Sequence, residues 1–234
     1  MTGTLYGLGI GPGDPDLITL KALKILQRSP VVAYPTLEDG DSLARAIVAP
    51  HLSGDQQEIS IRIPMAVERK PAQDAYDIAA EELSACLASG KDIAVLCEGD
   101  PFFYGSFMYL FGRMAEKFPV EVVPGVSSLT ACATALQTPL SARNDVLTVL
   151  PAPLDSETLR ARIEAADSIA IMKVGRHFER VRLLIKQMGL IDKAHYIERA
   201  SMENQKIMPL EEVPADAAPY FSMILIHKRG QAWK

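Results

Sequence analysis

The 234-residue chain has little cysteine: it contains Cys86, Cys97 and Cys132, and no two of them form a CxxC pair. An odd count without a paired spacing argues against a disulfide framework or a zinc site, so we expect no metal and a reducing compartment. No apolar run approaches the roughly 20 residues that span a bilayer, and no basic segment with a long apolar core stands at the start. We therefore predict a cytoplasmic protein without a membrane partner.

Positive charge is also scarce, with 24 lysines and arginines against 29 aspartates and glutamates and a net charge of −5. A nucleic-acid surface normally needs a basic excess, so we expect no nucleic-acid partner. An anionic small substrate stays compatible, because it needs only a local cationic wall. Hydrophobic residues make up 48% of the chain, which is enough for a sizeable core.

Short apolar segments alternate with segments of helical spacing, which predicts an α/β fold with mostly parallel strands. Asp14 or Asp16 can cap the first helix. The expected strands are 5–10, 31–34, 59–63, 93–97, 120–123, 146–150, 168–174, 194–198 and 221–227, with an edge strand at 205–208. The expected helices are 17–26, 42–49, 72–89, 107–117, 129–136, 157–166 and 179–188.

Residues 137–144 contain Pro139 and have no clear period, so they mark the expected domain boundary. The pattern restarts after them. We therefore predict two α/β domains, residues 1–137 and 138–234, with parallel or mixed sheets and an active-site cleft between them.

The glycine-rich loop at 7–15 does not match a dinucleotide-binding loop. Counted from Gly7, the third glycine of GxGxxG falls on Pro12, and counted from Gly9 no glycine completes the motif. Asp14 would also place a negative charge where a pyrophosphate should lie. The loop is either a plain tight turn or a close backbone approach to a neutral or cationic ligand.

A second loop, residues 98–106 (EGDPFFYGS), combines two carboxylates, two glycines and three aromatic residues directly after an apolar strand. A purely local interpretation is that Asp100 caps the next helix and Pro101 fills its first turn. Similar loops follow other strands, at 7–15, 124–128 and 172–177. Loops after parallel strands gather at one edge of a sheet, so we expect a shared site.

Residues 9–15 (GIGPGDP), 99–101 (GDP) with Tyr104-Gly105, and 124–128 (PGVSS) resemble the three signature loops of the tetrapyrrole methylases. These are the class III S-adenosylmethionine-dependent methyltransferases of corrin and sirohaem synthesis. The resemblance covers nearly the whole chain, with the loops in the family's order and spacing. Residues 75–80, 97–109 and 171–177 further resemble the subfamily that methylates precorrin-2 at its C-20 bridging carbon.

The resemblance implies a homodimer of two-domain subunits, each holding S-adenosylmethionine folded between its domains and releasing S-adenosylhomocysteine. It assigns the adenine, methionine and carboxylate ends of the cofactor to separate loops. Where relatives often have glycine, this chain has Ala200. The implied cofactor residues are Pro12 beside the adenine, Glu98, Gly99, Asp100 and Phe103 at the methionine end, Ser127 and Ser128 at its carboxylate or amino group, and Met172 and Ala200 with backbone toward the adenine.

The residue chemistry agrees with such a ligand. Its ammonium and sulfonium are cations, which the carboxylates at 98–100 favour, and Phe103 or Tyr104 can add a cation–π contact of about 1 kcal/mol. Its carboxylate suits Ser127, Ser128 and the free backbone amides that begin the next helix.

The implied substrate is a polycarboxylate macrocycle, which needs cations. Lys173, Arg176, His177 and Arg180 cluster where a helix is expected to begin, a position at which cations oppose the helix dipole. The cluster is either an anion site or a solvated charged face. Arg143 is a further candidate for substrate binding.

The implied reaction is an in-line methyl transfer from sulfur to a ring carbon, which needs no metal. Loss of a proton after transfer needs a base, for which Glu98, Asp100 and Tyr104 are candidates. Two alternatives stay open: a cobalt-containing macrocycle as substrate, and a nucleotide-binding regulatory module without turnover.

Overall fold

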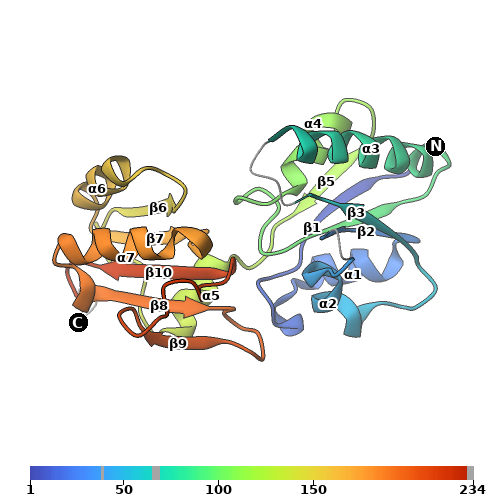
Figure 1. The fold of residues 1–234 in the computed structure, drawn as a ribbon. Coiled ribbons are helices and arrows are strands. Elements are labelled where there is room, and N and C mark those ends of the chain that lie inside the picture. Colours follow the sequence, from blue (N-terminus) through green and yellow to red (C-terminus); the bar gives the residue numbers. More distant parts are fainter. Residues whose placement is uncertain (38–39, 65–68, 231–234) are drawn as a thin grey trace. The chain divides into compact units, whose positions relative to one another are not determined.

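A computed structural model of the chain describes residues 1–37, 40–64 and 69–230. By its internal contacts the chain divides into two units, Met1–Ser127 and Ser128–Lys234. Figure 1 shows that each unit has its own sheet with helices around it. The expected linker, residues 137–144, lies within the second unit. The expected cleft between domains stays a prediction.

The first unit contains a five-stranded parallel sheet, as the alternating pattern predicts. Its strand order is β3-β2-β4-β1-β5, so β1 lies between β4 and β5, and Leu5 pairs with both Ile93 and Val120. The loops after these three strands therefore leave from one edge of the sheet. The strands are β1 (Leu5–Gly9), β2 (Val31–Thr36), β3 (Gln57–Arg62), β4 (Ile93–Cys97) and β5 (Val120–Val123).

Helices cover both faces of this sheet (Figure 1). Helices α3 (Arg69–Ala88) and α4 (Phe107–Met114) bury residues such as Leu83 and Phe107 against one face. Helices α1 (Leu20–Arg28) and α2 (Leu43–Val48) pack against the other face. Successive side chains of a strand point to opposite faces, and both faces of this sheet are covered by helices. The sequences of β1 and β4 are therefore nearly continuous apolar runs.

Helix α1 begins later than the sequence indicates, and neither Asp14 nor Asp16 caps it. Thr19 is its N-cap, with Oγ1 accepting from the Ala22 N–H at 3.2 Å. Asp14 instead caps a 3₁₀ turn (Pro15–Leu17) and accepts from the Asp16 N–H at 2.9 Å. The loop therefore contains an extra tight turn before the helix.

The second unit has a mixed sheet in the order β6-β7-β10-β8-β9. Strands β6 and β7 are parallel, β10 is antiparallel to both β7 and β8, and β9 is antiparallel to β8 at the edge, as expected for residues 205–208. The strands are β6 (Leu147–Pro151), β7 (Ser168–Met172), β8 (Ala194–Glu198), β9 (Lys206–Pro209) and β10 (Ser222–His227).

Three α-helices complete the described part of the second unit: α5 (Ser128–Ala135), α6 (Ser156–Ala165) and α7 (Phe178–Gln187). Apolar residues of α6 and α7 pack with the sheet in one core, whereas α5 contacts β10. Strand β7 is shorter than expected, because Lys173 has a left-handed φ of +58° that ends the extended backbone before a 3₁₀ turn at Gly175–His177.

Candidate functional site

Two loops of the first unit are joined by backbone hydrogen bonds where β1 and β4 end. The Ile10 N–H donates to the Cys97 carbonyl at 3.1 Å, and the Gly99 N–H donates to the Gly11 carbonyl at 2.8 Å. Gly11 and Gly99 form an antiparallel bridge, and both have positive φ, +83° and +66°. Glycine adopts that backbone without steric cost, which explains its place at both positions.

The third loop, after β5, meets the other two in direct backbone contact. A Cβ on Gly9 would lie 2.4 Å from the Gly125 nitrogen and 2.8 Å from the Gly99 carbonyl oxygen. Since β1 lies between β4 and β5, the loops that follow β4 and β5 meet across the end of β1. Three glycines thus let three loops converge at one edge of the sheet, as the sequence predicts for these loops.

Asp100 does not cap helix α4, which begins at Phe107 after Ser106 and has no side-chain cap. Its Oδ1 accepts from the backbone N–H groups of Phe102 at 2.9 Å and Phe103 at 3.1 Å. Its Oδ2 accepts from the Gly125 N–H at 3.0 Å, across to the third loop. The Asp100 carboxylate therefore accepts hydrogen bonds both from its own loop and from the loop after β5.

The Glu98 side chain is half-buried, and its burial raises the pKa of the carboxyl above the ordinary value. Its own backbone N–H and that of Ala44 oppose this rise by donating to the charged form. A carboxylate in such surroundings gains from a cation nearby.

Cys97 and Tyr76 lie close to Glu98 beneath the loop. Burial raises the pKa of the Cys97 thiol to about 11 and that of Tyr76 to about 12, and the charge of Glu98 adds to both. A thiol in that state is mostly protonated at neutral pH, so Cys97 is a poor nucleophile. Tyr76 belongs to α3, and the sequence signal for it is the resemblance of residues 75–80 to the subfamily.

Aromatic and apolar side chains of the loop and of the start of α4 are exposed. Phe102 and Tyr104 are 52% and 42% exposed, and Met108 and Tyr109 of α4 are exposed as well. Tyr104 has a φ of +57°, a backbone state that costs about 1–3 kcal/mol in a residue with a side chain and clusters at functional sites. Phe103 is half-buried, with its ring edge-on to Tyr104 at 5.2 Å.

The first unit therefore gathers most of the predicted residues at one edge. Pro12 is buried in the first loop and Ser127 is half-buried at the end of the third. Ser128 follows directly as the first residue of α5. The gathered residues are Pro12, Glu98, Gly99, Asp100, Phe103, Tyr104 and Ser127.

The second unit brings Met172 and Ala200 to one edge of its own sheet. Met172 is the last residue of β7 and Ala200 follows β8, and these two strands flank β10 and run in the same direction. The Met172 carbonyl accepts from the Ala152 N–H at 2.8 Å. Ala200 is buried between Arg199 and Ser201, both of which have positive φ.

The basic cluster lies at the same edge as Met172. Lys173 and Arg176 precede α7, and Arg176 Nε lies 3.4 Å from His177 Nε2. Burial lowers the pKa of His177, and the charges of Arg180 and Arg176 lower it further. Arg180 turns inward, donating to Ser156 Oγ at 3.1 Å and to the Ala152 carbonyl.

Arg143 is not brought to this cluster. It lies before β6 in a loop held by Asp145, whose Oδ2 is 3.2 Å from Nε2 of His227. His227 pairs with Ser168 at the amino end of β7, whereas Lys173 follows the carboxyl end. Because β6 and β7 are parallel, a residue that precedes β6 and one that follows β7 lie at opposite ends of the sheet.

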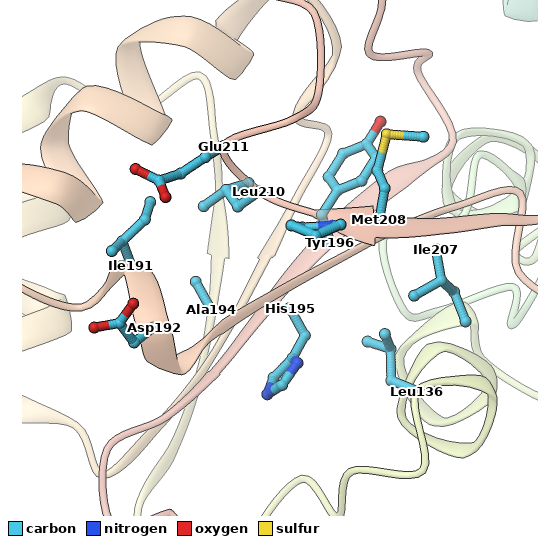
Figure 2. A pocket seen from close by; sticks show the side chains of 11 residues that line it. Leu136, Ile191, Asp192, Ala194, His195, Tyr196, Ile207, Met208, Leu210 and Glu211 are labelled. Carbon is cyan, nitrogen blue, oxygen red and sulfur yellow. The ribbon is translucent and has the colours of Figure 1, made fainter.

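A hollow of about 450 Å³ lies along β8 and β9 (Figure 2). The His195 ring and the side chains of Leu136 and Ile207 stand on one side of it, and the Asp192 and Glu211 carboxylates lie toward one end. Its lining includes none of the predicted site residues.

Among the described residues, no helix has the length and apolarity needed to cross a membrane.

In the first unit, loops that contain glycines converge at the end of a parallel sheet, and the second unit has a mixed sheet. This arrangement defines a class of two-unit α/β proteins whose ligands bind at the loops that follow the strands. The family model for Tetrapyrrole (Corrin/Porphyrin) Methylases matches residues 4–214. The chain belongs to this family.

Curated relatives refine this placement. The chain is 38% identical over 232 residues to cobalamin biosynthesis protein CobIJ of Mycobacterium tuberculosis, covering 96% of the chain and 46% of that protein, so it spans about half its length. It is 39% identical to a precorrin-2 C(20)-methyltransferase from Sinorhizobium sp, covering 96% of the chain and 95% of the relative. It is 32% identical to a cobalt-precorrin-2 C(20)-methyltransferase of Salmonella typhimurium, covering 99% of each.

A solved structure has the same fold. It is a uroporphyrin-III C-methyl transferase from Thermus thermophilus complexed with S-adenyl homocysteine, with a TM-score of 0.69 and 21% identity, covering 98% of this chain and 94% of that one. At this identity the likeness supports the fold.

Proposed function

We propose that the chain is an S-adenosylmethionine-dependent methyltransferase that methylates precorrin-2 at its C-20 bridging carbon and gives precorrin-3A in cobalamin biosynthesis. The observation that carries this proposal is the 39% identity to a precorrin-2 C(20)-methyltransferase over nearly the full length of both chains. The convergence of the three glycine loops supports it, because these are the loops on which the family resemblance rests.

The residues at the loop edge fit S-adenosylmethionine. Glycines leave no Cβ between the loops, so backbone carbonyls such as that of Gly99 come close together. The carboxyl of Glu98, whose pKa burial raises, would be stabilised as a carboxylate by the cofactor's ammonium or sulfonium. Ser127 and Ser128 stand at the start of α5, and the partial positive charge at the N-terminal end of a helix suits a carboxylate. Pro12 and Phe103 would supply apolar contact.

When bound, S-adenosylmethionine supplies an activated methyl group. The chain's own contribution is to hold donor and acceptor in line and to exclude water, and good alignment is worth about 7–11 kcal/mol. Glu98 and Tyr104 are the proposed proton acceptors after transfer, since both stand at the loop edge. Asp100 belongs to the same site and has a separate role, argued below.

Residues of the second unit complete the proposal. Met172 and Ala200 would offer backbone groups to the adenine. Lys173, Arg176 and His177 would meet substrate carboxylates, a proposal supported by the charges near His177: burial lowers the pKa of its imidazole, and the charges of Arg180 and Arg176 lower it further. Arg143 lies at the other end of the sheet and is not part of this group. The homodimer and the cytoplasmic location are likewise proposals, supported by the family resemblance and by the three free cysteines.

A cobalt-containing substrate is the second candidate, because the relative from Salmonella typhimurium carries that name and matches over 99% of both chains. The test is to give the purified protein S-adenosylmethionine with metal-free precorrin-2 or with its cobalt complex, and to follow S-adenosylhomocysteine and product mass. Faster turnover of the metal-free macrocycle supports the main proposal, and turnover of the cobalt complex alone supports the second.

Binding must be tested in parallel. Thermal unfolding with S-adenosylhomocysteine, NAD or ATP would show which ligand raises the melting temperature. Stabilisation by NAD or ATP alone, with no turnover of either macrocycle, would replace both proposals with a nucleotide-binding module.

A further inference from the structure

The Asp100 carboxylate has three of its roughly four acceptor positions taken by the backbone. Two of the bonds, from Phe102 and Phe103, form a turn inside its own loop. The third, from Gly125 at 3.0 Å, reaches a loop 25 residues further along the chain. The side chain therefore faces the protein more than it faces a ligand.

We propose that Asp100 is a positioning residue: it pins the loop that carries Ser127 to the loop that carries Glu98 and Phe103 before any ligand binds. This inference rests on the proposed function for what the pinned loops hold. The pin itself is a property of the ligand-free chain.

The neighbouring contacts show why a pin is needed at this point. Gly125 packs against the Gly99 carbonyl and the Gly9 backbone with no side chain between them. Such contacts resist closer approach but do not hold the loops together. The first two loops are joined by the Gly99–Gly11 hydrogen bond, and Asp100 supplies a hydrogen bond that reaches the third.

The pin should act on affinity more than on chemistry. If only a fraction of the protein molecules is in the pinned state, the apparent affinity for S-adenosylhomocysteine falls in proportion to that fraction. A hydrogen bond to a charged group is worth about 1.5–3 kcal/mol, so the dissociation constant of S-adenosylhomocysteine should rise by about 10- to 100-fold at most. The rate at saturating cofactor should change by less than about threefold, because Asp100 does not touch the reacting atoms.

The test variant is Asp100→Asn. Asparagine keeps the shape and one acceptor oxygen for the turn, but it places an NH₂ group opposite the Gly125 N–H, and two donors cannot bond. Asp92→Asn is the matched control: Asp92 Oδ1 accepts from the Thr4 N–H at 2.8 Å at the opposite end of β1 and β4. Both variants neutralise one carboxylate that accepts from the backbone of the same sheet. Asparagine at 92 keeps an oxygen for the one bond from Thr4, whereas asparagine at 100 cannot accept through both positions.

The first readout is hydrogen exchange of the Gly125 amide by NMR in the ligand-free protein. We expect protection in the wild type and in Asp92→Asn, and faster exchange in Asp100→Asn. Unprotected Gly125 in the wild type overturns the pin, even if Asp100→Asn does not fold. Unchanged exchange in Asp100→Asn overturns it as well.

The second readout separates binding from turnover. Weaker S-adenosylhomocysteine binding with a near-normal rate at saturating S-adenosylmethionine supports a positioning role. A rate that falls by a hundredfold or more at saturation assigns Asp100 to the chemistry instead and overturns the proposal. If the wild type protects Gly125 but binds no S-adenosylhomocysteine, the proposed function fails and the pin between the loops stands.

Discussion

A Cβ placed on Gly125 would lie 2.0 Å from the carbonyl oxygen of Gly99, closer than any real side chain comes. The two glycines belong to loops after β4 and β5, which do not pair with each other but flank β1. Their contact therefore closes over the end of β1. A site built in this way depends on glycine positions at which an added Cβ would displace neighbouring backbone atoms.

Gly125→Ala should destabilise the protein and weaken S-adenosylhomocysteine binding. Overpacking of this kind costs about 1–3 kcal/mol in the free energy of unfolding, and here the displaced atoms belong to the site. Urea denaturation and calorimetric titration measure the two effects. The control is Gly112→Ala in α4, where a Cβ meets nothing within 4 Å and alanine should stabilise the helix by up to about 1 kcal/mol. Equal behaviour of the two variants would contradict the prediction.

Glu98→Gln should make the ligand-free protein more stable at neutral pH. Burial raises the pKa of Glu98 above its ordinary value of 4.5, so the folded state holds the proton more tightly than the unfolded chain. Wild-type stability should fall as pH rises from about that value through the raised pKa, and the loss is complete above it. Glutamine carries no charge and removes this loss.

The measurement is the free energy of unfolding of wild type and Glu98→Gln across a pH series. The gap between the two should widen with rising pH, and parallel curves would disprove the assignment. Glu116→Gln, at an exposed position, is the control for adding an amide. We expect Glu98→Gln to bind S-adenosylhomocysteine more weakly despite its greater stability.

Thiol labelling of the native protein should reach Cys86 first. Burial raises the pKa of Cys97 to about 11 and that of Cys132 to about 12, so neither presents a thiolate at neutral pH. Cys86 is half-buried. Peptide mass spectrometry after brief iodoacetamide treatment gives the order, and Cys97→Ala should keep methyl transfer. Loss of turnover in a folded Cys97→Ala protein would restore the thiol as a nucleophile.

Arg176→Ala should raise the pKa of His177 toward its ordinary value of 6.5, because the Arg176 charge is one cause of its lowering. NMR titration of the imidazole measures this directly. The KM for the macrocycle should rise by about two- to fivefold, since an exposed ion pair is worth about 0.2–1 kcal/mol. Arg162→Ala, at an exposed position of α6, should change neither quantity.

The sequence predicts the buried strands best. Strands β4, β5 and β8 have the expected bounds. For β4 the reason is an unbroken apolar run between charged residues, which leaves few alternatives. The extent of β2 was wrong: it continues through Pro35 to Thr36. Pairing of β2 with β4 ends at Ala33, so Pro35 lies where that side of β2 is open and its missing N–H costs no bond.

The loops that meet at the edge of the first sheet could be predicted from the sequence, but the hydrogen bonds between them could not. The glycines and carboxylates of the loops could be found by type and spacing. The bond from Gly125 to Asp100 could not, since it depends on the strand order that brings residues 25 positions apart together. Likewise, no pattern tells that Arg180 turns inward toward Ser156 while Arg176 stays exposed.

The place of β1 between β4 and β5 also constrains the order of events during synthesis. Leu5 pairs with Ile93 and Val120, so β1 is synthesised well before either of the strands that pair with it. Such distant pairing slows folding and leaves an apolar strand uncovered in the meantime. The nascent chain therefore has to be guarded from aggregation until residue 123 has emerged, and the loop edge can form only after that point.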